Sequence, residues 1–485
     1  MADPRKRAAQ AFEQARALHA RGDIAGATKL YRDILKVQPN NPTLLRLLGA
    51  AELAGGFHEQ GTSRLNKAAK LDPRDPGAPT ELGLAAFQSG KLADALAHFD
   101  NAVGRRAAYA PAVYGRTLTL CAEAKYGDAL RSLEPIVRAG PVEPMVAVAF
   151  GRVCRRTGQH GEGSAVLAAV ENATPDVLFE LARLYDSEGK HDEAFDAATR
   201  AHQLMNLSFD GDKAETAVDD MIASWTPDRI ASLPHSAVES ELPVFVVGMP
   251  RSGLALVEAI AGAHPKVIGL GETGIIESLT ARVLGASGTR ASGLSERLDG
   301  LKQLTLDRAA ATFLQTFARP ASDASRLIDR TPVNFVHIGI IKLMFPSARI
   351  IHVVRNPMDA CLSAYFEAFR SRPAFASGLE SLGRFQLIHD CLMEHWREVL
   401  GPDAWHEVRY ESLVEEPEPT IRGIIDAMGL DWHDDCLKFW ESDRRTSASL
   451  WSDLRVPIHA RRVGWSQPYH ERASALREAL AGTAV

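Results

Sequence analysis

A glycine-flanked loop behind an apolar run carries the clearest chemistry in the sequence. The stretch VFVVGMPRSGLALVEAI spans residues 244–260, and Gly248 and Gly253 stand at the two glycine positions of the phosphate-binding pattern G-x-x-x-x-G-K-[ST]. A strand, a tight loop and a helix in this order direct backbone N–H groups towards a bound phosphate. Leu254 replaces the lysine of that pattern, and Ala255 replaces the hydroxyl that would bind magnesium. The loop therefore predicts an anion site that lacks both side chains of a magnesium-dependent kinase or ATPase.

A second group of anion-binding residues lies further along the chain. The loop itself supplies a cation, Arg251, and a hydroxyl, Ser252, while Arg355 follows another predicted strand and Ser363 lies two turns into the next predicted helix. A guanidinium and a hydroxyl in this arrangement can hold a second phosphate. A salt bridge with Asp359 would explain Arg355 if it stood alone, but the neighbouring loop favours phosphate binding. Two phosphate sites on one sheet indicate a nucleotide that is phosphorylated at two places.

The positions of these residues follow from an alternation of strands and helices in the second half of the chain. Strand-like runs cover residues 243–248, 326–329, 349–354 and 404–409, and helix-like segments cover 252–263, 334–345, 356–370 and 411–429. Such alternation predicts a parallel sheet with helices on both faces. Ligands of these sheets bind at the carboxyl ends of the strands, where the anion-binding residues indeed occur.

The first two hundred residues repeat with a period of 34. Helix-ending glycines, prolines, small residues and large apolar residues recur in four superposed series. The series are Gly22, Gly56, Gly90 and Gly158, with Ala124 at the skipped position; Pro39, Pro73, Pro141 and Pro175; Ala27, Gly61, Ala95, Ala129 and Gly163; and Tyr31, Leu65, Phe99, Leu133 and Leu167. Each unit is predicted to be a helix–turn–helix, because glycine ends the first helix and proline limits the second.

This pattern resembles a tetratricopeptide array. Roughly five units fit between residues 8 and 175, and a shortened sixth unit contains Gly189 and Ala194. The resemblance implies a superhelix whose concave surface binds a protein or peptide partner. Packing on the second domain or dimerisation is an equally open role, because a fold alone does not determine function.

The second half resembles the sulfotransferases that use 3′-phosphoadenosine 5′-phosphosulfate (PAPS), and within them the branch of tyrosylprotein sulfotransferases and bacterial repeat–sulfotransferase fusions. The matching stretches run in order over nearly all of residues 243–470: VFVVGMPRSG, AHPKVIGLGE, DRTPVNFVHIGIIKLMFPSARIIHVVRNPMDACLSAYFEAF, HWREVL, VRYESLVEEPEPTIRGIIDAMGL and SASLWSDLRVPI. The predicted organisation is an all-α tetratricopeptide solenoid over residues 1–205, a linker with a helix or two over 206–240, and an α/β, P-loop-like parallel-sheet sulfotransferase domain over 241–485.

The resemblance also implies which residues hold the nucleotide. The 5′-phosphosulfate would be held by Pro250, Arg251, Ser252, Gly253, Leu254 and Ala255. Arg355 and Ser363 would hold the 3′-phosphate, and Ser449 and Arg455 belong to a late segment that closes over the nucleotide. The resemblance implies PAPS as co-substrate and no metal ion.

The same resemblance implies a catalytic set of three residues. Glu272 would be the general base that takes the proton from an acceptor hydroxyl. Arg330 would neutralise charge on the bridging oxygen, at a place where the family usually carries lysine, and Arg251 would supply a further fixed cation. The alternative for Glu272 is a carboxylate that only stabilises the start of a helix.

Two other patterns compete for a functional role. Residues 269–274, GLGETG, fit a dinucleotide-binding pattern, but the residues about 20 positions further on do not form the second strand that such a site needs. His337 and His352 are conceivable bases, yet both lie inside apolar patterns. We therefore expect the two histidines to be packed or bonded to the backbone.

Three positions depart from the sulfotransferase pattern. Leu254 and Ala255 replace two threonines, and Arg330 replaces the lysine. Each lost hydroxyl removes a hydrogen bond to a charged group, about 1.5–3 kcal/mol, so nucleotide binding weakens by roughly 10²-fold or more. The leading hypothesis remains an active PAPS-dependent sulfotransferase that modifies a protein or peptide hydroxyl, with tyrosine among the candidates and the acceptor recruited by the repeats. The alternative is a degenerate, weakly active or inactive domain within a protein-interaction scaffold.

Composition and charge limit the number of domains, the kind of partner and the cellular location that the sequence allows. The chain has 485 residues, is 46% hydrophobic and 24% charged, and carries a net charge of −6, which predicts two or three domains and argues against a nucleic-acid partner. The absence of a secretory signal and of a membrane-spanning stretch, with five scattered cysteines, predicts a cytoplasmic protein without a metal site. The oligomeric state stays open, as does the acceptor: protein tyrosine, small molecule, lipid or glycan.

Overall fold

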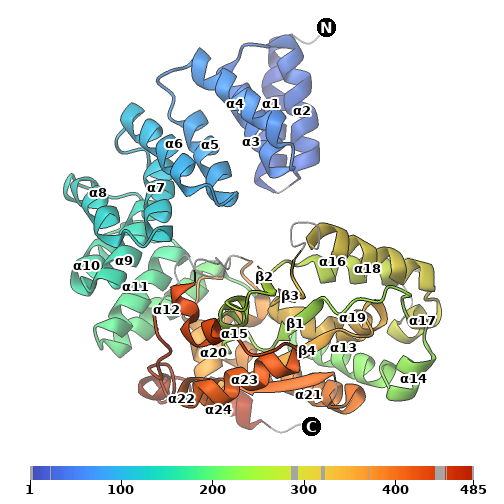
Figure 1. Ribbon diagram of the computed structural model, residues 1–485. Coiled ribbons are helices and arrows are strands. Elements are labelled where there is room, and N and C mark those ends of the chain that lie inside the picture. The colour runs from blue at the N-terminus through green and yellow to red at the C-terminus, as the bar shows by residue number, and fades with distance from the viewer. Residues whose placement is uncertain are drawn as a thin grey trace. The chain divides into compact units, whose positions relative to one another are not determined.

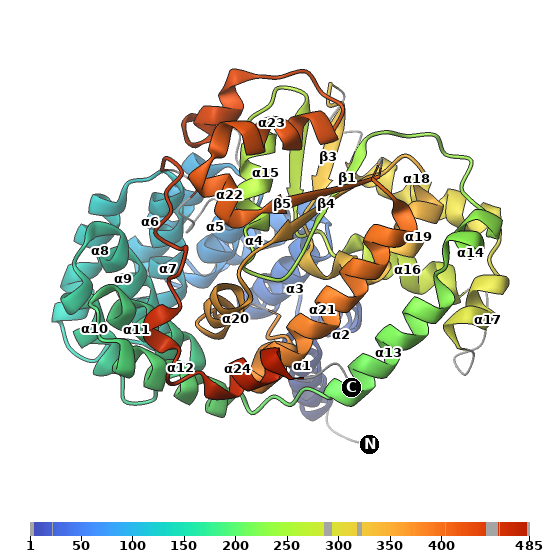
Figure 2. The ribbon, with the colours of Figure 1, turned by 90° about the horizontal axis from the view of Figure 1, so that it is seen from below.

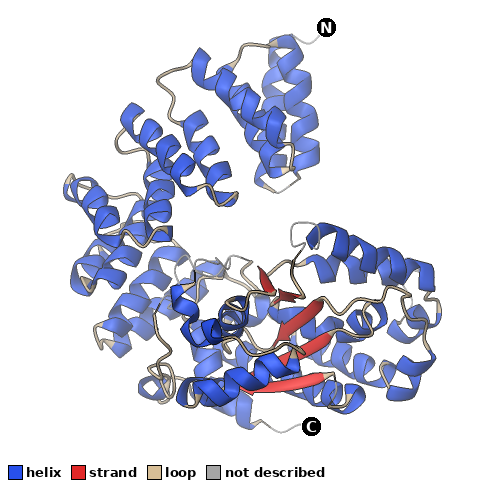
Figure 3. Cartoon of the chain, viewed as in Figure 1, coloured by secondary structure: helices blue, strands red, loops and turns tan. Residues whose placement is uncertain are grey.

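The computed structural model of the chain describes residues 4–21, 23–285, 293–317, 323–369, 371–402, 404–442, 454 and 456–482 (Figure 1). The chain forms two compact units, Met1–Lys190 and His191–Val485. The described part of the first unit is helical, whereas the second unit contains a sheet with helices around it (Figure 3). The predicted fold class, a helical repeat region followed by a parallel-sheet domain, is confirmed.

The first unit consists of helices that pack as successive pairs. They are α1 (Pro4–Ala20), α2 (Ile24–Val37), α3 (Pro42–Ala54), α4 (His58–Leu71), α5 (Gly77–Gln88), α6 (Leu92–Arg105), α7 (Ala110–Ala122), α8 (Tyr126–Arg138), α9 (Pro144–Thr157), α10 (His160–Ala168) and α11 (Pro175–Ser187). From α1 to α10, each odd-numbered helix packs against the even-numbered helix that follows it. This pairing is the helix–turn–helix unit that the 34-residue period predicts.

Backbone geometry explains the glycine series of the repeats. Gly56, Gly90 and Gly158 follow the first helices of their pairs with φ angles of +82°, +73° and +80°. This left-handed conformation is accessible to glycine at little cost and lets the chain reverse after a helix. Ala124 occupies the skipped position and adopts the same conformation, with φ +59°. The apolar series fills the interior, and Phe99 is fully buried.

Helix α12 (His191–Met205) continues the repeat pattern but belongs to the second unit. Phe195 packs against Tyr365 with ring centroids 5.5 Å apart, and Thr199 Oγ1 lies 3.0 Å from the Tyr365 hydroxyl. His202 Nε2 donates a hydrogen bond to the Tyr365 carbonyl at 2.8 Å. The compact units therefore divide before α12, whereas the repeat pattern places the end of the array after it.

The sheet of the second unit has five parallel strands in the order β2-β3-β1-β4-β5. The strands are β1 (Pro243–Val247), β2 (Val267–Gly271), β3 (Arg326–Asp329), β4 (Arg349–Val354) and β5 (Trp405–Arg409). Four of them lie where the sequence predicts strands. The additional strand, β2, is short and contains two glycines, so its apolar pattern is weak.

Strand β1 shows how the sheet is covered on both sides. Val244 and Val246 face a core formed with α15, α22 and α23, and Phe245 and Val247 face a core formed with α13, α16, α18, α19 and α21. Helices α15, α22 and α23 lie on one side of the sheet, and α13, α16, α19 and α21 lie on the other (Figure 2). Successive side chains of a strand point to opposite faces, so both faces of this central strand are apolar.

The helices of the second unit lie before, between and after these strands. After α12 come α13 (Gly211–Ser224), α14 (Pro227–Ser232), α15 (Leu254–Gly262), α16 (Ile275–Gly285), α17 (Leu294–Asp299), α18 (Gln303–Phe317), α19 (Ile338–Met344), α20 (Pro357–Tyr365), α21 (Leu379–Leu400), α22 (Tyr410–Glu415), α23 (Pro417–Ala427) and α24 (Ser474–Ala481). Short 3₁₀ helices are η2 (Pro332–His337), η3 (Ala374–Ser377), η4 (Asp434–Glu441) and η6 (Gln467–Tyr469). Helices α13 and α14 occupy the predicted linker and are part of this unit.

The cysteines are all free. Cys121, Cys154, Cys361 and Cys436 are buried, and Cys391 is exposed on α21. Over the parts of the chain that the structure describes, no helix is both long enough and apolar enough to cross a membrane.

Candidate active site

The residues with the clearest chemistry converge at the carboxyl ends of the strands. Gly248 follows β1, Glu272 follows β2, Arg330 follows β3 and Arg355 follows β4. Tyr410, which the sequence analysis did not single out, follows β5. Because all five strands are parallel, these ends lie along one edge of the sheet, where such folds bind their ligands.

The loop after β1 has the backbone geometry of an anion site. Gly248, Arg251 and Gly253 have φ angles of +152°, +73° and +116°. A Cβ on Gly248 would lie 2.5 Å from the carbonyl oxygen of Val353, so no larger residue fits there. Helix α15 begins directly after the loop, and the first N–H groups of a helix have no acceptor within it. The loop and the helix start therefore present backbone donors to a negative charge.

Hydrogen bonds and an ion pair connect the two predicted phosphate sites. Arg251 Nε donates a hydrogen bond to Ser363 Oγ at 3.1 Å, and its Nη1 lies 3.3 Å from a carboxylate oxygen of Glu367. Arg355 Nη1 donates to the backbone carbonyl of Arg251 at 2.9 Å. The loop after β1 and helix α20 after β4 are thus connected directly.

Arg355 is not primarily a salt-bridge partner of Asp359. The two side chains approach only to 4.0 Å, and the Asp359 carboxylate accepts hydrogen bonds from the backbone N–H groups of Gly464 and Ser466 at 2.7 and 2.9 Å. Arg355 Nη2 instead donates to the carbonyl of Arg462 at 2.6 Å. Burial lowers the pKa of Arg355, and the nearby Tyr410 and Asp359 oppose that shift.

The polar groups at this edge fit a phosphorylated ligand. Ser252 is only 1% exposed, yet its Oγ has no hydrogen-bond partner among the described residues, and the same holds for Arg355 Nε. A buried hydroxyl without a partner costs about 1–3 kcal/mol, which a phosphate oxygen would relieve. Ser449 and Arg455, which the sequence analysis also assigns to the nucleotide, lie outside the described residues.

Leu254 and Ala255 differ in what they can contribute. Leu254 is 4% exposed, and its side chain packs in the core beneath the sheet, so only its backbone N–H can reach a ligand. Ala255 is half-buried and lies one position further into α15. The two departures from the family pattern are therefore not equivalent, because one is part of the core and the other is not.

The predicted base and the predicted second cation are in direct contact. Arg330 Nη1 donates to the carboxylate of Glu272, and Arg330 Nε donates to Glu258 Oε2 at 2.5 Å. The Glu272 side chain is 55% exposed, whereas that of Arg330 is 8% exposed. Burial alone would lower the pKa of Arg330, but the two carboxylates outweigh burial and raise it. Arg330 is therefore a fixed positive charge beside an accessible carboxylate.

A buried aspartate organises the turn that carries Glu272. Asp329 accepts hydrogen bonds from Thr273 Oγ1 at 2.5 Å, from the Thr331 N–H at 2.9 Å and from Asn334 Nδ2 at 3.1 Å. Burial raises the pKa of Asp329, and these hydrogen bonds oppose the shift. The cluster connects the residue after Glu272 with the residues on either side of Arg330, so both side chains start from a well-supported backbone.

The two histidines that the sequence analysis considered as bases, His337 and His352, are unsuited to that role. Burial lowers the pKa of His337 to about 4 and that of His352 to about 3. His352 packs against the rings of His389 and Trp405 with centroids 5.4 Å away in each case. Its two ring nitrogens have no hydrogen-bond partner among the described residues, so it is packed but not bonded to the backbone.

The sequence analysis missed residues whose roles depend on contacts between elements. Glu258 pairs with Arg330 from helix α15, and its helical position alone does not reveal this. The Tyr410 ring packs against Gly253, where a Cβ would lie 2.8 Å from the ring, and the Arg355 guanidinium lies 4.6 Å from its centroid. The signal for Tyr410 was available, because it is the first residue after a predicted strand.

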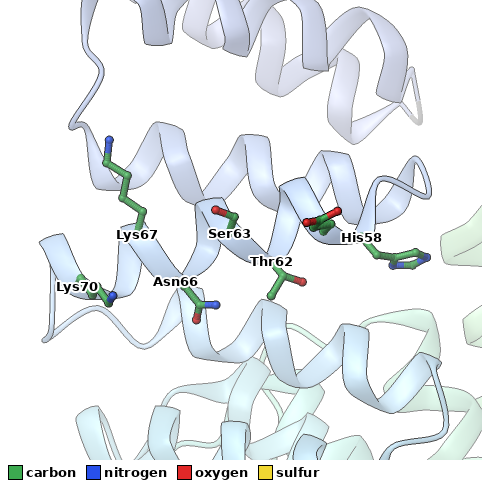
Figure 4. Close-up of a pocket in the computed structure, with 7 residues that line it drawn as sticks. His58, Thr62, Ser63, Asn66, Lys67 and Lys70 are labelled. Atoms are coloured by element: carbon green, nitrogen blue, oxygen red, sulfur yellow. The ribbon is translucent and has the colours of Figure 1, made fainter.

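The first unit has a separate polar hollow along one face of helix α4 (Figure 4). Its volume is about 720 Å³, and its lining consists of His58, Glu59, Thr62, Ser63, Asn66, Lys67 and Lys70. All of these residues come from a single helix, so the hollow is an open polar face. It contains none of the predicted catalytic or nucleotide-binding residues.

The described residues show no group of three or more His, Cys, Asp or Glu side chains placed to hold a metal ion.

Comparison with protein families gives one match in each unit of the chain. Residues 243–434 match a family described as "Sulfotransferase family", and residues 51–111 match a tetratricopeptide repeat. The first match contains every strand of the sheet and all of the predicted catalytic residues.

Individual relatives are distant. An "Uncharacterized protein" of Aquifex aeolicus (strain VF5) is 29% identical over 310 residues, which are 62% of this chain and 41% of that protein. Protein-tyrosine sulfotransferase 2 of Gallus gallus is 27% identical over 211 residues, 41% of this chain and 54% of that protein. The chain thus spans only about half of these relatives or less. A solved structure, the sulfotransferase domain from the Synechococcus PCC 7002 olefin synthase, aligns at a TM-score of 0.33 and 19% identity over 49% of this chain and 98% of that chain.

Proposed function

We propose that this chain, which joins tetratricopeptide repeats to a domain of the sulfotransferase family, transfers a sulfuryl group from PAPS to an acceptor hydroxyl on a protein or peptide. The observation that carries the proposal is the network of Arg251, Ser363 and Arg355, which connects two anion-binding elements of neighbouring strands. A donor with phosphate groups at both its 3′ and 5′ positions suits two such elements.

In this proposal the protein holds the donor at two places. The backbone of the loop, the start of α15 and the Ser252 hydroxyl hold the 5′-phosphosulfate, and Arg251 supplies positive charge there. Arg355 and Ser363 hold the 3′-phosphate. Arg355 follows the end of β4 and is buried, whereas Arg251 lies in the loop after β1 and is held by Ser363 and Glu367. Both charges are therefore in place before the ligand arrives. Fixed charges of this kind stabilise charge that develops in a transition state without further reorganisation.

Glu272 and Arg330 then act on the reacting atoms. Glu272 accepts the proton of the acceptor hydroxyl while the acceptor oxygen bonds to sulfur and the bond between sulfur and the 5′-phosphate oxygen breaks. Arg330 neutralises the charge that this departure leaves on the phosphate oxygen. The contact between Arg330 and Glu272 supports this pair of roles.

The acceptor is proposed from two lines of support. Several relatives are named protein-tyrosine sulfotransferases, at 25–28% identity, which makes a tyrosine hydroxyl one candidate. Tetratricopeptide arrays commonly bind proteins or peptides, and the first unit offers such an array with an open polar face. We propose that the array recruits the protein that is modified.

Two measurements test the proposal. Titration with adenosine 3′,5′-bisphosphate, the product that PAPS leaves behind, should show one binding site by calorimetry. Incubation with sulfur-labelled PAPS and a cell lysate should transfer label to protein. Binding of the bisphosphate without transfer to protein, peptide or small-molecule hydroxyls would favour the alternative, a scaffold with a degenerate sulfotransferase domain. No binding at all would exclude the nucleotide site itself.

Ala255→Thr is expected to tighten binding of adenosine 3′,5′-bisphosphate by about 10-fold or more, because a restored hydroxyl can hydrogen-bond a phosphate. Ala255 is half-buried at the start of α15, so the larger side chain has room to turn towards the ligand. Calorimetry of the variant and the wild-type chain measures the change. Unchanged affinity would show that the phosphate lies elsewhere.

Leu254→Thr is the matched comparison, since it adds the same hydroxyl one residue earlier. Leu254 is part of the core, so this variant should lose about 2–4 kcal/mol of unfolding free energy. Denaturant unfolding measures that loss and separates it from effects on affinity.

A further inference from the structure

Glu258 is a fully buried carboxylate whose oxygens are divided between two partners. Its Oε2 accepts from Arg330 Nε at 2.5 Å, and its Oε1 accepts from the Gly271 N–H at 2.6 Å. Its side chain is 0% exposed. Arg330 is the predicted cation, and Gly271 directly precedes the predicted base, Glu272. The Glu258 carboxylate therefore holds both the cation Arg330 and the backbone directly before the base Glu272.

Two of the three glycines of the GLGETG motif, Gly269 and Gly271, are explained by this carboxylate. A Cβ on Gly269 would lie 2.7 Å from Glu258 Oε1, so the carboxylate occupies the space that a side chain would need. Gly271 has φ +76°, and the pairing of β2 with β3 shifts register between Gly269 and Gly271. The irregularity turns the Gly271 N–H towards Glu258. These glycines therefore serve an internal carboxylate, and the resemblance to a dinucleotide-binding pattern is incidental.

The backbone adds a second connection between the same residues. The Arg330 N–H donates to the Gly271 carbonyl at 3.0 Å. Gly271 is thus held by Glu258 through its N–H and by Arg330 through its carbonyl. Any shift of the Glu258 carboxylate would move the Arg330 guanidinium and the chain just before Glu272 together.

We propose that Glu258 is a positioning residue that aligns the cation Arg330 with the base Glu272 and acts as the permanent counter-ion of that cation. The inference rests on the proposed function. Without Glu258, the buried Arg330 would have Glu272 as its remaining carboxylate partner at this place. A base that is held as the sole counter-ion of a buried arginine is a weaker proton acceptor. With Glu258 present, Arg330 keeps a partner while Glu272 takes up the proton.

Burial supports this division of roles. Desolvation raises the pKa of Glu258, and the Arg330 charge and the Gly271 hydrogen bond oppose that shift. A carboxylate in this setting is stable as an anion only beside its arginine, and it is too enclosed to receive a proton from a substrate. Breaking such a pair by removing one charge is costly, because the other charge stays buried.

Glu258→Gln tests the proposal, since it keeps the side-chain shape and removes the charge. The rate of label transfer from saturating sulfur-labelled PAPS to lysate protein should fall by about 10²-fold, the effect of a small misplacement of reacting groups. Affinity for adenosine 3′,5′-bisphosphate should stay at the wild-type value, because the hydrogen bonds of Arg251 and Arg355 go to Ser363 and to backbone carbonyls, and those of Glu258 go to Arg330 and Gly271. If Glu258 only stabilised the fold, its substitution would lower both the transfer rate and the affinity for the bisphosphate.

Glu52→Gln is the matched control. Glu52 is also fully buried and pairs with two arginines, Arg32 at 3.0 Å and Arg64 at 2.6 Å, but it lies in the repeat array. It should reproduce the loss of stability that follows from removing a buried charge. It should lower the transfer rate far less than Glu258→Gln does, because Glu52 lies in the unit proposed to recruit the acceptor and not beside the reacting atoms. A rate loss equal to that of Glu258→Gln would overturn the assignment.

Gly269→Ala serves where Glu258→Gln does not fold, because it leaves every charge in place and displaces only the carboxylate. It should also lower the rate at unchanged nucleotide affinity. In an Arg330→Gln background, Glu258→Gln should cause no further loss, since residues that act through one another are not additive. The proposal would be overturned if Glu258→Gln and Gly269→Ala both transferred label at the wild-type rate. It would also be overturned if the rate losses of Glu258→Gln and Arg330→Gln were fully additive. If the wild-type chain transferred no label at all, the proposed function would be wrong, and this inference, which rests on it, would fall as well.

Discussion

Glu272→Gln is expected to lower the rate of sulfuryl transfer by about 10²–10⁴-fold, the usual contribution of a general base. The amide cannot accept the proton of the acceptor hydroxyl. It retains the shape of the side chain and can still receive a hydrogen bond from Arg330. Because the Glu272 side chain is 55% exposed, its charge contributes little to folding, and the variant should unfold at nearly the same denaturant concentration as the wild-type chain. The rate is measured with labelled PAPS, and binding with adenosine 3′,5′-bisphosphate.

Glu277→Gln is the control for this experiment. Glu277 is exposed on α16, the helix that follows the Glu272 turn, and its substitution removes the same charge from the same region. It should leave both the rate and the affinity unchanged. If Glu272→Gln transfers label as fast as the wild-type chain, Glu272 only stabilises the start of a helix, and the base must be sought elsewhere.

A fragment of residues 206–485 is expected to be less stable than a fragment of residues 191–485 by on the order of 5 kcal/mol. The shorter fragment lacks α12, whose Phe195 is buried against Tyr365 and whose His202 and Thr199 hydrogen-bond the same tyrosine. Tyr365 ends helix α20, which also carries Ser363. Urea unfolding of both fragments measures the difference, and the shorter one should also bind the bisphosphate more weakly.

Phe195→Ala in the full chain isolates the packing contribution and should cost about 3–5 kcal/mol of the second unit's stability. Equal unfolding midpoints for the two fragments would show that α12 belongs to the array in energetic terms, as the repeat pattern alone suggests. The outcome therefore decides whether residue 190 or residue 205 is the functional boundary.

The fold was largely predictable because its signals are local or periodic. The 34-residue series predicted helix pairs, and four apolar runs predicted four strands that the structure contains. Parallel strands place their ends at one edge of the sheet, so the positions of Arg330 and Arg355 followed from those runs alone. The strand-like residues KVI precede GLGETG, but this run was not counted among the strands of the sheet, because Gly269 and Gly271 interrupt the apolar pattern of β2.

The site was predictable only where residues follow strands. The assigned roles of Arg251, Glu272 and Ser363 stay predictions, although the structure brings Arg251 to Ser363 and Arg330 to Glu272. Glu258 could not be found, because a glutamate in a short apolar helix gives no sign of its partner on another strand. Burial of a charge is a property of the assembled fold, and no local pattern encodes it.

The buried cysteines of the wild-type chain can report local unfolding in each unit. Burial raises the pKa of Cys121 and Cys154 to about 12 and that of Cys436 to about 11, and it raises the pKa of Cys361 further still. Alkylating reagents attack the thiolate, so these four cysteines react only when their surroundings open. Two of them belong to the repeats and two to the sheet domain, while Cys391 is exposed and labels first. Peptide mapping of alkylation over time would therefore read the opening of the repeats and of the sheet domain separately, in one sample and without any substitution.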